Sequence, residues 1–345
     1  MISLKNYQKE AVDELRERVN KLLDKAGNQV CIFKAPTGSG KTIMMAEFLK
    51  EFVEHRGDRR SLAFIWAAPR KLHTQSKEKL ESYYSDSKAL RCSFFEDLMD
   101  KRIGQNEILF LNWESINKKG NLIIRENEQE NNLTKILENT REDGQDIILV
   151  IDESHHAAQT DTSQNLIHDI DPQVTVEVSA TPHLSSDYRV VVEFDDVKQE
   201  GMIKQEVAIN PEFQNIKIGE KSADEVVLDA ALGKRKELAK AYKEGGSEIN
   251  PLVLIQLPDK RRGSDDKKDI IMAILKKKGV TVDNGKLAIY LSENKENLAN
   301  IAKSNNDAEV MIFKQAIALG WDCPRASILV LFRDWRSIVF SIQTI

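Results

Sequence analysis

The sequence predicts an α/β protein in which two tandem domains each hold a parallel sheet covered by helices. Short runs of β-branched and other apolar residues alternate with segments of helical periodicity along the chain. A Lys- and Glu-rich helical segment, ending at the Gly-Gly-Ser sequence 245–247, separates a longer series of apolar runs from a shorter one. The 345 residues of the chain are also enough for two ordinary domains.

The apolar runs are the candidate strands. Runs that are apolar throughout and bounded by helical segments are typical of strands that a parallel sheet buries on both faces. In the first series they lie at 29–35, 61–68, 107–112, 146–152 and 174–179, and in the second at 251–257, 286–291, 309–314 and 327–332. We therefore expect a first domain at 1–195, a connector at 196–250 and a second domain at 251–345.

Composition and charge narrow the class of protein. With 41% hydrophobic and 30% charged residues, the chain has the composition of a soluble globular protein rather than a disordered one. Its apolar stretches fall short of the roughly 20 residues of a membrane span, and its N-terminus lacks the order of a secretion signal. We therefore expect a cytoplasmic protein. The formal charge of −5 gives no bulk attraction for nucleic acid, although a local basic groove stays compatible with binding it.

The cysteines indicate neither a disulfide framework nor a zinc site. Cys31, Cys92 and Cys323 are widely spaced and odd in number. We interpret all three as buried free thiols and expect no structural metal.

The strongest functional signal is the segment APTGSGKT at 35–42, which follows the first candidate strand and precedes a helix-competent segment. It fits the phosphate-binding pattern G-x-x-x-x-G-K-[ST], with Ala35 in place of the first glycine. In such a loop the glycines let backbone N–H groups surround the β- and γ-phosphates, the lysine adds a point charge and the threonine ligates Mg²⁺. The alternative, an ordinary glycine-containing turn, is disfavoured by the flanking strand and helix. The predicted ATP-binding residues are Thr37, Gly38, Ser39, Gly40, Lys41 and Thr42.

A nucleotide loop needs an acidic site beside it, and ILVIDESHH at 148–156 places one at the end of an apolar strand. Asp152 is the predicted Mg²⁺ ligand, and Glu153 is the predicted base that orients and deprotonates the attacking water. A lone Asp-Glu pair is usually a solvated turn, but its pairing with the phosphate loop favours catalysis. His155 and His156 have no partner at zinc-ligand spacing, so a hydrogen bond near the γ-phosphate is the better interpretation. The predicted catalytic residues are Lys41, Asp152 and Glu153.

The order of three motifs carries a resemblance to a known family. The phosphate loop at 35–42, DESH at 152–155 and SATP at 179–182 each follow a candidate strand, in the order found in superfamily-two helicases. The resemblance implies two RecA-like domains, ATP and Mg²⁺ as cofactors, and a nucleic acid as partner. It also implies that His155, Ser179 and Thr181 relay the state of the nucleotide to the strand-binding face.

Three further segments resemble weaker helicase motifs. LKNYQKEAV at 4–12 resembles the motif in which a glutamine, here Gln8, hydrogen-bonds adenine. AAPRKLHTQ at 67–75 and LNWESI at 111–116 resemble motifs that touch the nucleic-acid strand, and the first implies contacts from Pro69, Arg70 and Lys71. Taken alone, a Tyr-Gln pair is common at a helix start and Pro-Arg-Lys is usually a solvated turn.

In the second half, ALGWDCPRA at 318–326 resembles the fifth motif of the motor subunit of type III restriction enzymes. The resemblance implies that Gly320 and Asp322 face the nucleotide across the domain cleft. Lys314 stands where many helicases have a threonine, and it either contacts a phosphate or caps its strand at the surface.

The last residues resemble the start of the sixth helicase motif. Gln343 corresponds to its first residue, and the arginine fingers of that motif would follow. We therefore expect the second domain to be incomplete, with Arg325 as the fallback candidate for a finger.

The sequence thus predicts an ATP-dependent helicase or translocase, most like the motor part of a type III restriction enzyme and weakly active as a fragment. DNA is the expected partner over RNA, through phosphate contacts, with a modification or specificity subunit as a further implied partner. A nucleotide-gated binding switch without translocation stays open. A nuclease is a third class, because Pro258, Asp259 and 293–295 superficially match a P-D…(D/E)-x-K pattern, but Glu293 follows its strand rather than lying in it.

Overall fold

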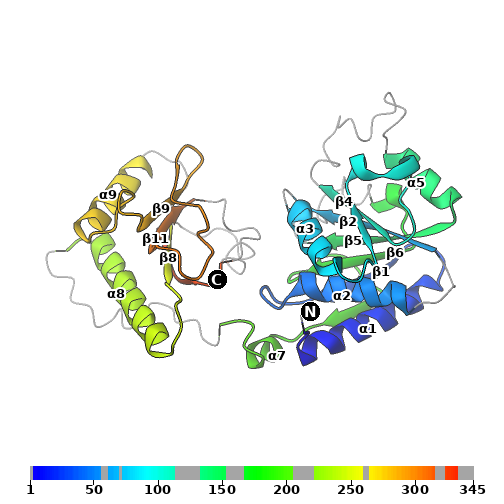
Figure 1. Cartoon of the computed structure of the whole chain (residues 1–345), viewed down its shortest axis with the longest axis horizontal. Helices are drawn as coiled ribbons and strands as arrows, with labels where there is room; N and C mark the ends of the chain where they lie inside the picture. The colour runs from blue at the N-terminus through cyan, green and yellow to red at the C-terminus, as the bar shows by residue number, and fades with distance from the viewer. Residues whose placement is uncertain are drawn as a thin grey trace. The chain divides into compact units, whose positions relative to one another are not determined.

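The structure, a computed structural model, describes residues 3–55, 61–69, 72–112, 133–152, 167–204, 221–258, 264–314 and 323–332. The chain divides into two compact units, Met1–Val207 and Ala208–Ile345, and each is organised around its own sheet (Figure 1). This confirms the predicted α/β class. The boundaries predicted for the two domains and the connector stay a prediction. Within the described part of the chain, no helix combines the length and the apolar character needed to cross a membrane.

The sheet of the first unit contains the five strands predicted from apolar runs, each within one residue at either end, and two short strands that the sequence did not predict. Its strands are β1 (Gln29–Lys34), β2 (Ser61–Ala68), β3 (Arg91–Ser93), β4 (Glu107–Asn112), β5 (Gln145–Asp152), β6 (Val174–Ser179) and β7 (Tyr188–Val191). Their order is β3-β4-β2-β5-β6-β1-β7, and every pairing is parallel. All seven strands therefore end at the same edge of the sheet.

Helices cover both faces of this sheet, as predicted for a parallel sheet. They are α1 (Asn6–Leu23), α2 (Lys41–Glu54), α3 (Leu72–Tyr84), α5 (Leu133–Glu142) and α7 (Phe194–Gln199), with 3-10 turns at Phe95–Asp97 and Met99–Lys101. On one face α1, α2 and α3 share an apolar core with the strands, in which Phe48 and Trp66 are fully buried. On the other face α5 packs its apolar stripe, Ile136 and Leu137, against Ile151. Each such side chain contributes about 1.5–3 kcal/mol by its burial.

The second unit holds a smaller sheet with all four predicted strands, each within one residue at either end. Its elements are α8 (Ala223–Glu244), β8 (Leu252–Gln256), α9 (Ser264–Lys277), β9 (Leu287–Tyr290), β10 (Lys295–Glu296), β11 (Val310–Phe313) and β12 (Ala326–Leu331). The strand order is β10-β9-β11-β8-β12, with an antiparallel pairing between β10 and β9 and parallel pairings elsewhere. α8 begins at Ser222, whose hydroxyl accepts a hydrogen bond from the Glu225 N–H at 3.2 Å, and it packs on this sheet beside α9.

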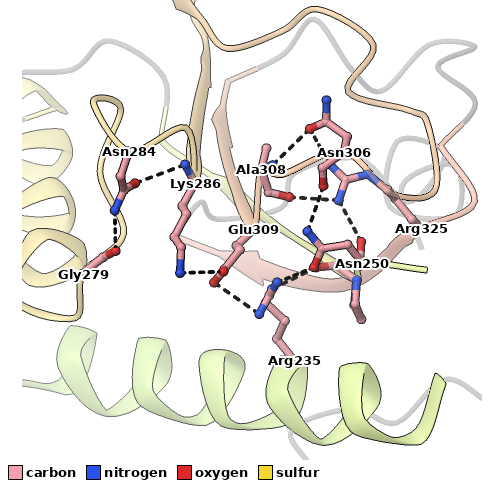
Figure 2. A network of polar contacts seen from close by, with 10 residues as sticks. Arg235, Asn250, Gly279, Asn284, Lys286, Asn306, Ala308, Glu309 and Arg325 are labelled. Atoms are coloured by element: carbon pink, nitrogen blue, oxygen red, sulfur yellow. Dashed lines mark hydrogen bonds and ion pairs between the residues drawn. The ribbon is translucent and has the colours of Figure 1, made fainter. Parts of the chain in front are cut away.

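Two buried arginines join the starts of the second unit's strands (Figure 2). The Arg325 side chain, 2% exposed, donates to the carbonyl oxygens of Ile301 at 2.7 Å, Asn250 at 2.8 Å and Ala308 at 2.9 Å. Arg235 of α8 forms an ion pair with Glu309 at 3.2 Å. Burial lowers the pKa of both guanidinium groups. Because Asn250 precedes β8 and Glu309 precedes β11, the network lies at the amino ends of these strands.

The cysteines differ in part from the expectation. Cys31 is buried, as predicted, whereas Cys92 and Cys323 are half-buried, which corrects the prediction of three buried thiols. Burial raises the pKa of the Cys31 and Cys92 thiols to about 12 each. Both thiols therefore stay protonated at neutral pH and are poor nucleophiles.

Candidate nucleotide-binding site

The phosphate-loop segment and the ends of three further strands lie at the carboxyl edge of the first sheet. β1 lies beside β6, with Lys34 opposite Ser179, and β5 lies on the other side of β6, with Asp152 opposite Val178. The phosphate-loop segment, Asp152 and Ser179 therefore follow three neighbouring strands at one edge. Pro69, which is buried, follows β2 at the same edge because Ala67 lies opposite Ile151.

The loop at 35–42 depends on two glycines with left-handed backbone conformations. Gly38 has φ +84° and Gly40 has φ +85°, values that cost a residue with a Cβ about 1–2 kcal/mol. Contacts add to this requirement, since a Cβ on Gly40 would lie 2.6 Å from Nε2 of Gln8 and one on Gly38 would lie 3.1 Å from Cγ2 of Ile203. Gly40 also begins α2, and its carbonyl oxygen accepts a hydrogen bond from the Met44 N–H at 3.0 Å.

Lys41 and Thr42 occupy the first turn of α2 and are half-buried. The Lys41 ammonium lies 3.4 Å from the carbonyl oxygens of both Ala35 and Pro36, so the side chain folds back over the loop that precedes it. Thr37 and Gly38 are exposed at the tip of this loop. The positive end of a helix dipole, backbone N–H groups and a lysine charge are features that favour an anion, and all three meet at this loop.

Two residues near the N-terminus, Tyr7 and Gln8, hydrogen-bond the phosphate loop. The carbonyl oxygen of Ser39 accepts hydrogen bonds from the Tyr7 hydroxyl at 2.8 Å and from Nε2 of Gln8 at 2.9 Å. Oε1 of Gln8 accepts a third bond, from the Lys5 N–H at 2.9 Å. Burial raises the pKa of Tyr7, which keeps its hydroxyl a donor. The sequence did not predict a role for Tyr7, and the predicted contact of Gln8 with adenine stays a prediction.

Asp152 ends β5 as a mostly buried carboxylate, 8% exposed. Its Oδ2 lies 3.4 Å from the Ser76 hydroxyl of α3, which donates to it. A carboxylate and a threonine hydroxyl at one sheet edge are the hard oxygen ligands that Mg²⁺ prefers when it also keeps water and phosphate ligands. The donor set of Asp152 and Thr42 therefore fits Mg²⁺.

The SATP segment is tied directly to the phosphate loop. The carbonyl oxygen of Ser179 accepts a hydrogen bond from the Ala35 N–H at 3.2 Å. The Ser179 hydroxyl, which is fully buried, accepts a bond from the Thr181 N–H at 3.1 Å. Ser179 is thus hydrogen-bonded both to the phosphate loop at Ala35 and to the turn that carries Thr181.

Residues 1–184 match the family described as type III restriction enzyme, res subunit. The chain belongs to this family. Membership confirms the resemblance to superfamily-two helicases that the motifs indicated. The two sheets, one in each unit, agree with the expected fold of two RecA-like units. Among proteins with curated descriptions, none matches this sequence.

Two solved structures are similar to this res-subunit family member to different degrees. RecG bound to a three-way DNA junction is 14% identical and has a TM-score of 0.50, and the match covers 95% of this chain and 38% of RecG. S. cerevisiae Dbp5 bound to RNA and ADP BeF3 is 16% identical with a TM-score of 0.46, and the match covers 99% of this chain and 83% of Dbp5. The likeness to RecG, at 14% identity, concerns the fold alone.

Several predicted site residues of the res-subunit family member lie outside the described residues. They are Arg70, Lys71, Glu153, His155, Gly320, Asp322 and Gln343. Their roles stay predictions. Lys314 follows β11 and is half-buried, and its carbonyl oxygen accepts a hydrogen bond from the Gln256 side chain at 3.0 Å.

The fallback role of Arg325 is corrected, and the pattern at 293–295 stays disfavoured. Arg325 is not available as an arginine finger, because its guanidinium is buried among backbone carbonyl oxygens at the amino ends of the second unit's strands. Glu293 and Lys295 are exposed, with Glu293 in the turn between β9 and β10. A carboxylate on an exposed turn lacks the shielded setting of a nuclease site, so the pattern at 293–295 does not indicate one.

Proposed function

We propose that this chain is the ATP-hydrolysing motor of a nucleic-acid helicase or translocase, acting on DNA in an enzyme of the type III restriction kind. The arrangement that supports the proposal is the loop at 35–42, which opens α2 beside Asp152 and is hydrogen-bonded to the SATP segment through Ala35 and Ser179. Such a motor has to bind the phosphates of ATP, and a neighbouring turn has to change its conformation when they are bound.

In this mechanism the first unit binds the triphosphate and prepares the water. The loop N–H groups and Lys41 hold the β- and γ-phosphates, and Gln8 contacts the base. Thr42 and Asp152 would hold Mg²⁺, which would supply positive charge that neutralises the phosphates. Glu153 accepts the proton of the attacking water. Gly320 and Asp322 keep the role in nucleotide binding that the resemblance of their motif implies.

Coupling to nucleic acid uses the neighbouring strand ends. Ser179, Thr181 and His155 pass the state of the γ-phosphate to the segment at Pro69, Arg70 and Lys71, which contacts backbone phosphates. Phosphate contacts position a strand but carry no sequence information. Target selection would therefore belong to a modification or specificity subunit.

The test is the ATP turnover of the 345-residue chain with Mg²⁺, alone and with DNA or RNA at fixed salt. We expect a low turnover that nucleic acid raises. We also expect Lys41→Ala to abolish ATP binding, and Glu153→Gln to bind ATP without hydrolysing it. Lys50→Ala is the matched control, because Lys50 lies on the same helix and contacts Glu47 at 3.5 Å instead of the loop. Turnover in Lys41→Ala equal to that of the parent would contradict the site. ATP binding without stimulated turnover would identify a nucleotide-gated switch instead of a motor.

A further inference from the structure

The strand β6 has a buried polar face, which is unusual for its position. β6 lies between β5 and β1, and its sequence VTVEVS alternates apolar and polar residues. Its valines belong to the core under α1, α2 and α3, so its polar residues point to the opposite face. Thr175, Glu177 and Ser179 are all 0% exposed. Central parallel strands are normally apolar on both faces, and buried polar groups are costly unless they are hydrogen-bonded. The polar side chains on this face of β6 are therefore expected to make specific hydrogen bonds.

The carboxylate of Glu177 binds two successive backbone N–H groups beyond the SATP segment. Oε1 accepts from the His183 N–H at 2.8 Å and Oε2 accepts from the Leu184 N–H at 3.0 Å. Hydrogen bonds to a charged acceptor are stronger than neutral ones, and a carboxylate can accept at both oxygens. Glu177 thereby closes the chain from Ser179 to Leu184 into a loop whose two ends are fixed to one another.

The closed loop has two further attachments. At its start, the Ser179 carbonyl oxygen accepts the hydrogen bond from the Ala35 N–H at the phosphate loop. At its end, Leu184 packs against the apolar cluster that includes Leu149 and Ile151. Between these points lies Thr181, whose N–H donates to the Ser179 hydroxyl. Groups on both sides of Thr181 are therefore fixed, on one side by Ser179 and on the other by the two bonds to Glu177.

We propose that Glu177 is a positioning residue, which holds the loop 179–184 in the geometry that lets Ser179 and Thr181 couple nucleotide to nucleic acid. The inference rests on the proposed function, since coupling has a meaning only in a motor. A glutamate is required because an ionised carboxylate is an acceptor at both oxygens. A glutamine would turn an N–H donor toward one of the two backbone N–H groups and lose that bond.

The first measurement is amide hydrogen exchange of the 345-residue chain, followed by mass spectrometry on peptides that cover 179–184. We expect Glu177→Gln to raise exchange there about tenfold or more, the size of effect expected when a charged hydrogen bond is lost. Glu107→Gln is the matched control. Glu107 is also a buried glutamate of this sheet and accepts from the Gly104 N–H at 2.7 Å, but it begins β4 at the opposite edge. Its substitution should leave exchange at 179–184 unchanged.

The second measurement separates coupling from stability, since either glutamine variant can lose stability. ATP turnover is followed with and without DNA, and the affinity for a fluorescent ATP analogue is measured on the same samples. We expect Glu177→Gln to keep nucleotide affinity and KM for ATP within about twofold while the stimulation by DNA falls about fivefold or more. Glu107→Gln should keep both, at temperatures where both variants are folded.

Three other results of these two measurements would each overturn one part of the proposal. Unchanged exchange in Glu177→Gln would overturn the structural part of the proposal. Raised exchange with full stimulation would show that the loop is ordered by Glu177 but that its order does not matter for coupling, which overturns the positioning role. A parent chain that nucleic acid does not stimulate would overturn the proposed function, and the coupling role of Glu177 with it, whereas exchange would still show whether Glu177 orders the loop.

Discussion

At Gly40, a side chain of any size would disturb the geometry of the phosphate loop. Its φ of +85° is unfavourable for alanine, and a Cβ there would lie 2.6 Å from Nε2 of Gln8. Gln8 could escape this contact only by giving up its bond to the Ser39 carbonyl oxygen. We therefore predict that Gly40→Ala lowers the free energy of unfolding by about 2–4 kcal/mol and weakens ATP binding, as measured by chemical unfolding and nucleotide titration.

Gly27 offers a control that separates backbone strain from contact. It has φ +79°, close to that of Gly40, but no atom lies within 4 Å of where its Cβ would be. Gly27→Ala should cost only the strain, about 1–2 kcal/mol, and should leave ATP affinity unchanged. Equal losses of stability and of ATP affinity in the two variants would show that the contact with Gln8 is not part of the site.

At the scale of elements, the first turn of α1 and the loop before α2 act as one unit. Tyr7 and Gln8 both donate to the Ser39 carbonyl oxygen. Removal of the Tyr7 hydroxyl leaves that oxygen with one donor fewer in a buried position. We predict that Tyr7→Phe costs about 0.5–1.5 kcal/mol of stability and weakens ATP binding, because the loop carrying Lys41 loses a support. Thermal unfolding and nucleotide titration measure the two effects.

Tyr84 is the matched control for this prediction. It is a buried tyrosine of α3, and its hydroxyl donates to a backbone carbonyl oxygen of α2, that of Ala46, at 2.9 Å. This bond lies away from the phosphate loop. Tyr84→Phe should cost a similar amount of stability without changing ATP affinity. A loss of ATP affinity as large in Tyr84→Phe would mean that α2 as a whole, and not the loop, responds to these substitutions.

The same scale shows what the sequence could predict. The central strands were found because buried parallel strands are continuous apolar runs, whereas β3 and β7 are short edge strands with exposed residues such as Arg91 and Arg189. The phosphate loop, Asp152 and Ser179 could be proposed as site residues from the sequence because each motif is contiguous. Glu177 was missed because its partners are backbone N–H groups that only the folded loop brings to it.

Arg325 shows how a local signal misleads. Because Arg325 lies in a motif that resembles a nucleotide-binding one, the sequence alone suggests a cation that can contact the nucleotide phosphates. Its three carbonyl partners come from separate segments, at Asn250, Ile301 and Ala308, and only the tertiary fold collects them. A buried guanidinium that satisfies backbone acceptors is costly to move, so its place in the second unit is structural.

At the scale of the whole molecule, the net charge of the chain limits how it can bind a nucleic acid. The chain has 50 basic and 55 acidic residues and a formal charge of −5. Net charge therefore repels a polyanion at long range, and affinity has to come from a few local contacts with phosphates. Such contacts release counterions, so binding should weaken as salt rises, by about 0.9 in the log–log slope for each phosphate neutralised on duplex DNA.

We predict that DNA binding is salt-sensitive and nearly independent of sequence. Titrations at several salt concentrations should give slopes that fall by about one when Arg70 or Lys71 is replaced by alanine. Lys21→Ala is the control, because Lys21 lies in the last turn of α1 and pairs with Glu17 on the same helix, and its slope should equal that of the parent. Scrambled oligonucleotides of equal length should bind within about tenfold of one another, which is about 1.4 kcal/mol, the size of one base-reading contact. A larger preference at fixed salt would mean that this chain itself reads bases, and target selection would then not require a separate subunit.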